Sequence, residues 1–434
     1  GELLVEAKQL LDETAAASGD EAVTVLNSTS FERNDVIYMD DTGKFVDGAT
    51  CQRITKLDGS KKLAVANVTL PPLAAVTLDL TDTESEGASP FAYKGNVLET
   101  PFATVTFTEE GTISSFYDKR ALRELVGEGY PLNTFLLAED VPLQWDNWDI
   151  DADVELKLKP VAKLLSEEVV SDGAVEFRMR RKYQLTEKSS ITQDMIFFAN
   201  SPEVRFETMM HWYDDHRLLK TAFDTSIFSD FVRQEIQFGY LKRPTTRNTS
   251  VEQAKFEVLN HKYTDLSEPK FGVSILNDCK YAISVYGGQL RLTLHKGGNR
   301  PDWDGDHGEH YCEYSFLPHE GGFSAETVVA PAYALNYKPL VFAGKADFAS
   351  LAKTADANIV IEAVKPCEDA ENAYILRLYE TEGGYTHTTL TLGHAPKSAA
   401  LCNMLEEVQE ELPAAKELAL TFRPFEIKTV KISY

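Results

Sequence analysis

The chain has 434 residues, of which 43% are hydrophobic and 26% are charged, and this balance is typical of a soluble globular protein with roughly two to four domains. Its formal net charge of −25 argues against nucleic acid and anionic membrane as partners, because both are polyanions. A neutral partner such as a sugar fits this charge better.

The five cysteines are widely spaced and contain no Cys-x-x-Cys pair, so the sequence predicts neither a disulfide framework nor a thiolate zinc site. We expect a reducing, cytoplasmic setting. No apolar run reaches the ~20 residues that span a membrane, and the N-terminus lacks a signal-peptide pattern. Since the first residue is Gly1 rather than Met, we expect the chain to be a piece of a longer protein.

The first predicted element is a single amphipathic helix, because residues 2–17 carry leucines and alanines at helical spacing. One helix alone would leave its apolar stripe unburied, so residues 1–19 are predicted to be the terminal helix of a helical bundle that lies upstream. From Ala22 onward the hydrophobic period changes to two. This period predicts half-buried antiparallel strands, most clearly at 175–180 and 203–212.

Two stretches divide the strand-rich region into units. Residues 81–90 are polar and turn-rich, and residues 345–358 are Ala-rich and predict a helical connector. We therefore expect a small β domain at 20–87, a large two-sheet β supersandwich at 88–342 and a C-terminal β-sandwich at 355–434. The middle unit is too long for an immunoglobulin-like module.

The most polar stretch of the chain is residues 297–310, which lie between two predicted strands and contain four glycines. Glycines permit backbone conformations that let polar side chains converge on one point. His307 and His310, with aspartates beside them, make a zinc, manganese or calcium site chemically feasible. Their spacing matches neither a helical metalloprotease motif nor a full calcium loop, so we predict no metal ligand here.

A second polar cluster, residues 139–151, places Trp145 and Trp148 beside carboxylates that include Asp146. Sugar sites combine aromatic faces, which cover C–H patches, with carboxylates that accept hydroxyl hydrogen bonds. Half-exposed tryptophans at a domain interface would give the same pattern, so both interpretations stay open. The sequence contains no nucleophile elbow, P-loop or dinucleotide fingerprint.

Taken in order, several segments resemble the C-terminal half of glycoside hydrolase family 38, the retaining α-mannosidases, and the cytosolic and bacterial branch most of all. The matching stretches are residues 140–142, 145–149, 216–223, 235–239, 243–245, 254–258, 271–280 and 314–319, with Pro301, Asp302, Asp306, Gly308 and His310 in the polar loop. Because the segments agree in the same order along the chain, the resemblance is far more specific than any one motif.

The resemblance implies a galactose-mutarotase-like supersandwich flanked by smaller β domains. It also implies an upstream (β/α) barrel, which would hold zinc or another divalent cation together with the aspartate nucleophile. Two carboxyl groups would then act across the glycosidic bond. We therefore assign no catalytic residue and no cofactor to this chain and expect it to be inactive alone. Its expected partners are mannosides or oligosaccharides and the upstream catalytic domain, and a homo-oligomer is compatible with the sequence.

The polar stretches and the resemblance together predict substrate-binding residues at the rim of the barrel's pocket. These residues are Arg300, Asp302, Asp306, His310, Trp145 and Asp146. In an alternative, Asp306 and His310 only cap their own loop. Two further hypotheses stay open: a stand-alone carbohydrate-binding β-sandwich protein without its own catalysis, and a mutarotase-like enzyme that uses His and Glu residues, which rests on fold analogy alone.

Overall fold

The computed structural model describes residues 21–85 and 87–434, and these residues are mainly β. Antiparallel strands form the sheets in this part of the chain, and the few described helices are short. The fold class predicted from the period-two pattern is therefore confirmed. The predicted helix at 1–19 lies outside the described residues. None of the described helices is both long and apolar enough to cross a membrane.

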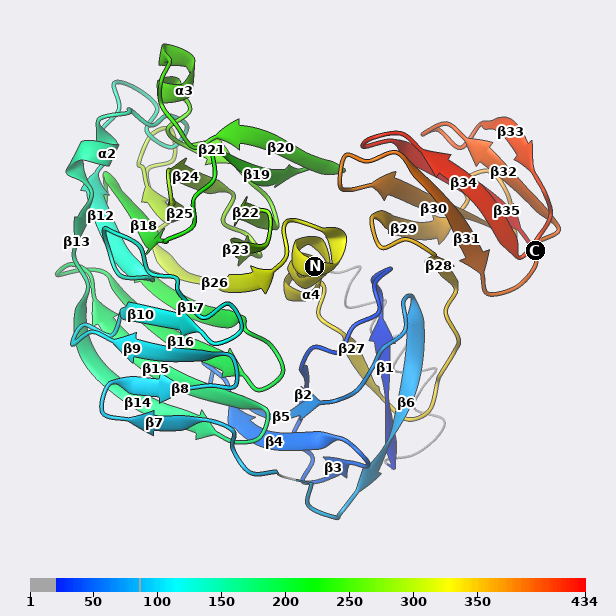
Figure 1. Cartoon of the computed structure of the whole chain (residues 1–434), viewed down its shortest axis with the longest axis horizontal. Helices are drawn as coiled ribbons and strands as arrows, with labels where there is room; N and C mark the ends of the chain where they lie inside the picture. The colour runs from blue at the N-terminus through cyan, green and yellow to red at the C-terminus, as the bar shows by residue number, and fades with distance from the viewer. Residues whose placement is uncertain (1–20, 86) are drawn as a thin grey trace.

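A sandwich of two small sheets forms the N-terminal β unit, residues 21–81, at the bottom of Figure 1. The sheets have the strand orders β27-β1-β6-β3 and β2-β5-β4. The strands are β1 (Ala22–Asn27), β2 (Ile37–Asp40), β3 (Phe45–Val46), β4 (Thr50–Thr55), β5 (Lys61–Ala66), β6 (Ala74–Thr81) and β27 (Leu340–Ala343). Aliphatic side chains such as Val25, Ile37 and Val65 fill the space between the sheets.

The supersandwich packs a nine-stranded, a six-stranded and a five-stranded sheet around the largest core cluster (Figure 1, left). The nine-stranded sheet has the order β14-β15-β16-β17-β26-β23-β22-β19-β20. Its strands are β14 (Lys163–Asp172), β15 (Glu176–Gln184), β16 (Ser190–Phe198), β17 (Val204–Trp212), β19 (Phe231–Ile236), β20 (Gly239–Pro244), β22 (Tyr263–Ser267), β23 (Phe271–Asn277) and β26 (Gly308–Glu320).

The other two sheets of the supersandwich have the orders β13-β12-β18-β25-β24-β21 and β11-β10-β9-β8-β7. Their strands are β7 (Ala92–Lys94), β8 (Val97–Glu99), β9 (Ala103–Phe107), β10 (Ile113–Asp118), β11 (Arg123–Glu124), β12 (Thr134–Glu139), β13 (Lys159–Pro160), β18 (Arg217–Asp224), β21 (Val258–Leu259), β24 (Ala282–Tyr286) and β25 (Gln289–Gly297). Aromatic rings from both large sheets meet in the core, where Phe223 stacks on Phe316 with ring centroids 5.7 Å apart.

Much of the outer face of the central strands β15, β16 and β17 is buried as well, so the prediction of half-buried strands is wrong there. Arg178 on that face pairs with Glu176, Asp194 and Glu207 at 2.8, 3.0 and 2.7 Å. Tyr38 of the N-terminal β unit donates a hydrogen bond to Glu176 at 2.5 Å. The N-terminal β unit covers this face, and the charged residues that alternate with core residues are buried as ion pairs.

The C-terminal sandwich, residues 352–434, has two sheets with the orders β28-β31-β34 and β29-β30-β35-β32-β33 (Figure 1, right). Its strands are β28 (Ala352–Thr354), β29 (Ile359–Pro366), β30 (Ala373–Glu380), β31 (Thr386–Leu392), β32 (Ser398–Cys402), β33 (Val408–Leu412), β34 (Glu417–Phe422) and β35 (Ile427–Ser433). The described helical segments of the whole chain are α2 (Val154–Lys157), α3 (Ser250–Ala254), η2 (Ala325–Val329) and α4 (Ala330–Asn336).

The segment that joins the supersandwich to the C-terminal sandwich returns first to the N-terminal β unit. There β27 pairs with β1, with Val341 opposite Val25. Residues 345–358 then contain no helix, so the prediction of a helical connector is wrong. Phe348 instead exchanges two main-chain hydrogen bonds of 3.1 Å with Ala75. Pairing with the N-terminal β unit outweighs the helix propensity of the alanines.

Candidate functional site

Two polar loops meet at one end of the six-stranded sheet. The Trp loop (residues 140–150) follows β12, and the Asp-rich loop (residues 298–307) follows β25. Both strands pair with β18, so that Glu139 lies opposite Arg217, and Arg217 lies opposite Gly297. Because β18 runs antiparallel to its two neighbours, both loops leave the sheet at the same end, beside the turn that precedes β18.

Asp146 joins the two loops. Its carboxylate accepts the main-chain N–H groups of Asn299 at 3.1 Å and Arg300 at 2.8 Å. Nδ1 of His216, in the turn before β18, lies 2.8 Å from Oδ2 of Asp146. In return, the main-chain N–H of Asn147 donates to the carbonyl of Arg300 at 2.9 Å. The two loops are therefore held together by hydrogen bonds to main-chain groups, and no exposed side chain takes part in these bonds.

The electrostatics of Asp146 follow from these contacts. The side chain is buried, with the residue 5% exposed. Burial alone would raise the pKa of Asp146, but the N–H groups of Asn299 and Arg300 and the imidazole of His216 outweigh burial and hold the pKa below its usual range. The carboxylate is thus kept charged, and its hydrogen bonds to the Asp-rich loop are of the stronger, charge-assisted kind.

A hollow of about 410 Å³ lies between the two loops. It is lined by Val141, Pro142, Leu143, Gln144, Trp145, Asp146, His216, Asn299 and Arg300. Trp145 is 51% exposed, and its ring lies 5.8 Å from that of Trp148 at an angle of 30°. The guanidinium of Arg300 stacks over the ring of Trp303 at 5.3 Å and makes no ion pair within the described part of the chain.

The chemistry of this hollow suits a neutral polar ligand. The indole of Trp145 offers an apolar face, while the guanidinium of Arg300 offers several hydrogen-bond donors that none of the described residues accepts. An aromatic face with a few polar groups at its edge is the arrangement that pyranose rings require. The structure therefore brings together Trp145, Asp146 and Arg300 of the six predicted residues.

The other three predicted residues lie along the Asp-rich loop and at the start of β26, away from the hollow. Asp302 accepts the N–H of Asp304 at 3.1 Å. Nε2 of His310 lies 2.6 Å from the carbonyl oxygen of Asp306, and the ring of His310 lies 4.4 Å from that of His295. These contacts stabilise the loop, and they leave the predicted sugar contacts of Asp302, Asp306 and His310 as predictions.

Three residues of the two loops and the turn before β18 have left-handed backbone conformations. Trp145, His216 and Asp306 have φ angles of 58°, 53° and 55°. This left-handed conformation costs of order 1–3 kcal/mol for a residue with a side chain, and it persists where surrounding contacts impose it. The sequence indicates no role for His216 or Asn299, because a scattered histidine and a loop asparagine have no distinctive spacing. Their shared partner, Asp146, lies far from both residues in sequence, so the contact becomes visible only from the register of the sheet.

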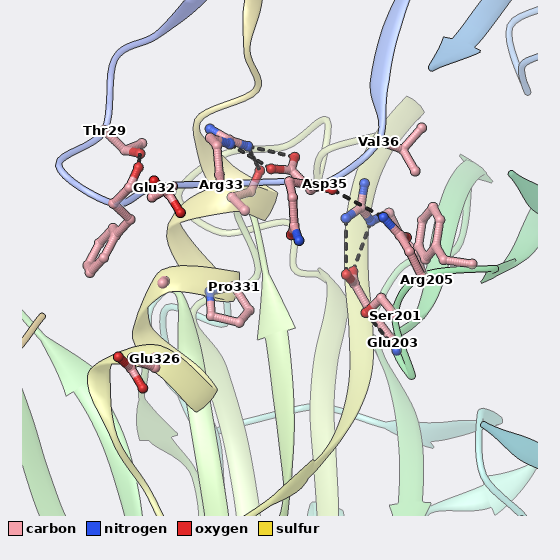
Figure 2. A pocket seen from close by; sticks show the side chains of 16 residues that line it. Thr29, Glu32, Arg33, Asp35, Val36, Ser201, Glu203, Arg205, Glu326 and Pro331 are labelled. Atoms are coloured by element: carbon pink, nitrogen blue, oxygen red, sulfur yellow. Dashed lines mark hydrogen bonds and ion pairs between the residues drawn. The ribbon is translucent and has the colours of Figure 1, made fainter. Parts of the chain in front are cut away.

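No group of three or more His, Cys, Asp or Glu residues within 21–85 and 87–434 is arranged to hold a metal ion. A second hollow, of about 230 Å³, lies between residues 29–36, the turn from β16 to β17, and α4 (Figure 2). Its arginines are already paired, Arg33 with Asp35 at 2.6 Å and Arg205 with Glu203 at 3.0 Å. We therefore assign this hollow to the contact between the N-terminal β unit and the nine-stranded sheet.

Comparison with known protein families shows to which family the chain belongs. The chain matches the glycosyl hydrolases family 38 C-terminal domain at residues 98–304 and the glycosyl hydrolases family 38 C-terminal beta sandwich domain at residues 358–430. The chain belongs to glycosyl hydrolase family 38 and carries its C-terminal domains. The resemblance drawn from the colinear segments is thereby confirmed. The candidate hollow lies within the first matched family 38 domain.

Family 38 relatives are similar over much of the chain. It is 34% identical to human alpha-mannosidase 2C1 over 76% of this chain and 33% of that protein. It is 31% identical to alpha-mannosidase G of Dictyostelium discoideum over 95% of this chain and 40% of that protein. The chain thus spans well under half of these curated relatives. A solved alpha-mannosidase from Enterococcus faecalis V583 shares the fold, with a TM-score of 0.73, 14% identity and coverage of 98% of this chain and 58% of that one.

Proposed function

We propose that this chain works as the C-terminal region of an α-mannosidase that hydrolyses terminal α-mannosides with retention of configuration. The observation that carries the proposal is the hollow between the Trp loop and the Asp-rich loop, in a chain whose curated family 38 relatives are named alpha-mannosidases. In this proposal the chain supplies scaffold and part of the rim of the substrate pocket. Mannosides or oligosaccharides are the ligands.

We assign the catalytic groups to an upstream barrel outside this chain. That barrel would supply the two carboxyl groups and zinc or another divalent cation, whose charge would hold the sugar's hydroxyls. The described residues of this chain do not fit such a cation, so no step proposed for them involves one. The free state of Cys51, Cys279, Cys312, Cys367 and Cys402 supports a reducing, cytoplasmic setting for the whole protein.

The rim residues have different parts in this proposal. Trp145 covers the C–H face of a sugar ring, and the guanidinium of Arg300 donates to its hydroxyls. Asp146 is a positioning residue, since its oxygens are used by the Asp-rich loop and His216. Asp302, Asp306 and His310 would contact a sugar that extends along the Asp-rich loop.

The test is release of nitrophenol from 4-nitrophenyl α-mannoside. The 434-residue chain is assayed alone with added zinc and again after joining it to the polypeptide encoded upstream. We expect no release from the chain alone and release from the joined protein. Activity of the chain alone would overturn the assignment of catalysis to an upstream barrel. Inactivity of a correctly folded joined protein would overturn the proposed hydrolase and favour a carbohydrate-binding β-sandwich.

A further inference from the structure

The hollow between the Trp loop and the Asp-rich loop is called the rim hollow below. A third hollow lies at the opposite end of the supersandwich from the rim hollow. It measures about 680 Å³ and is lined by residues 126–128, 225–228 and 286–289. The strands β18 and β25 connect the two ends, since Arg217 and Gly297 lie at the rim whereas Asp224 and Gln289 lie beside this far hollow. At about 3.3 Å per residue, these strands separate the two hollows by roughly 25 Å.

Tyr286 forms one aromatic wall of the far hollow and is 53% exposed. The guanidinium of Arg247 lies 5.1 Å from the centre of its ring. Arg247 is itself fixed, because its two terminal nitrogens donate to the carboxylate of Glu155 at 2.6 and 2.7 Å. An exposed ring that is braced by a fixed cation loses little conformational entropy when a ligand packs on it.

Phe228 forms the other aromatic wall and is 84% exposed. Its main-chain N–H donates to Glu268 at 3.0 Å, and Arg123 binds both oxygens of Glu268 at 2.7 and 2.8 Å. Arg123 also donates to the carbonyl of Ser226 at 2.6 Å. The backbone that carries this phenyl ring is therefore fixed, although the ring itself stays in solvent.

Two glycines in the lining of the far hollow, Gly127 and Gly288, sit where two segments of the chain approach closely. A Cβ atom at Gly127 would lie 2.3 Å from the carbonyl oxygen of Thr225, and one at Gly288 would lie 2.4 Å from the same oxygen. Both positions therefore require glycine, because a larger residue would push the strands apart. These two glycines therefore keep the segments that line the far hollow close together, and neither adds a side chain to its surface.

We propose that the far hollow binds a neutral, mannose-rich oligosaccharide, at a distance from the bond that the enzyme cleaves. This inference rests on the proposed function. The C–H faces of sugar rings pack on Phe228 and Tyr286, while Gln289 and Glu128 at the edge offer hydrogen-bonding groups to hydroxyls. Glu128 makes no ion pair among the described residues, and the chain's formal charge of −25 disfavours a polyanionic ligand.

The far hollow would act as an anchor for a long substrate. An oligosaccharide held at one end of the supersandwich raises the local concentration of its other residues near the rim. A short aryl mannoside cannot reach both places. The far hollow is therefore expected to affect binding of polymeric substrates and to leave the cleavage of small substrates unchanged.

The first test uses electrophoresis of the 434-residue chain through gels that contain soluble yeast α-mannan. We expect the mannan to retard the chain, and Phe228→Ala and Tyr286→Ala each to weaken that affinity about tenfold, as loss of an aromatic anchor does. The matched control is Tyr385→Ala, because Tyr385 is 64% exposed on the C-terminal sandwich. Circular dichroism and melting temperature verify that each variant is folded.

The same variants are made in a Trp145→Ala background, which removes the aromatic face of the rim hollow. A further loss on adding Phe228→Ala supports the far hollow. Unchanged mannan affinity in folded Phe228→Ala and Tyr286→Ala proteins, or an effect confined to Trp145→Ala, would overturn the inference. Capture of mannan does not depend on hydrolysis, so this result is separate from the test of the proposed function.

Discussion

The carboxylate of Asp146 accepts the main-chain N–H of Arg300 at 2.8 Å, although 154 residues separate the two in sequence. This contact fixes the position of the Arg300 backbone, while the ring of Trp303 is the one described side chain that contacts its guanidinium closely. The rim hollow therefore combines a rigid frame with a side chain that can adjust to a ligand. In this arrangement Asp146 holds the Asp-rich loop in place, and Arg300 is the residue proposed to contact the ligand.

Replacing Asp146 with alanine should release the Asp-rich loop. The change leaves two main-chain N–H groups without their acceptor, and we expect the free energy of unfolding to fall by about 2–4 kcal/mol. Urea denaturation measures the loss, and hydrogen exchange should show faster exchange at Asn299 and Arg300. The control is Asp149→Ala in the same loop, where the exposed carboxylate accepts a single hydrogen bond from the described residues, the N–H of Ile150 at 2.9 Å. Equal stability of the two variants would contradict the role of Asp146.

The same carboxylate predicts a pH dependence. The pKa of Asp146 is lowered in the folded chain, so its contribution to stability is present above its unfolded pKa of about 4 and is lost as the pH falls through the folded value. We expect the difference in unfolding free energy between the natural chain and Asp146→Asn to shrink as the pH falls below about 4. A difference that stays constant down to pH 3 would contradict this prediction.

Arg300→Ala should separate binding from stability. The guanidinium makes no ion pair within the described residues, so the free energy of unfolding should change by less than about 0.5 kcal/mol. In the joined enzyme we expect KM for α-mannosides to rise about tenfold, because the sugar hydroxyls lose their donors. Arg423→Ala, on the exposed surface of the C-terminal sandwich, is the control. An unchanged KM would remove Arg300 from the proposed rim.

Gln52 should be important for the contact between the N-terminal β unit and the supersandwich. Its side-chain oxygen accepts the N–H groups of Val175 and Glu176, both at 2.8 Å. Its nitrogen donates to Ser171 at 2.7 Å and to the carbonyl of Glu176 at 2.9 Å. We expect Gln52→Ala to lower the free energy of unfolding by about 2–4 kcal/mol, measured in urea. Gln253→Ala, at an exposed helix position, should have no such effect.

The strands show how far the sequence alone could go. The alternation around Phe206 and Met210 predicted which side chains enter the core, because a period of two is a local property of the chain. The opposite face of the same strand carries Arg205 and Glu207, which are buried because the N-terminal β unit covers them. No local pattern records which unit packs on a sheet, so the prediction of half-buried strands was wrong for a reason outside the strand itself.

The candidate site shows the same limit. Aspartates and tryptophans marked both polar loops, and glycines marked the Asp-rich loop as well, because such residues in a strand-to-strand connection are visible in sequence. That Asp146 would hold the Asp-rich loop rather than present its oxygens to a ligand depends on the register of β12, β18 and β25. His216 entered the site only through that register. The far hollow was invisible as well, since Phe228 and Tyr286 lie far apart in sequence and have no distinctive spacing.

Because β27 pairs with β1, the N-terminal β unit is built from two segments that are far apart in sequence, and the units of this chain are not independent domains arranged in sequence order. A polypeptide cut at residue 88 would deprive the N-terminal β unit of a strand that the chain supplies only after the whole supersandwich. Excision of the supersandwich would likewise leave β1 with an unpaired edge. The N-terminal β unit expressed without β27 should therefore fold poorly. In chimaeras, β1 and β27 should come from the same parent protein.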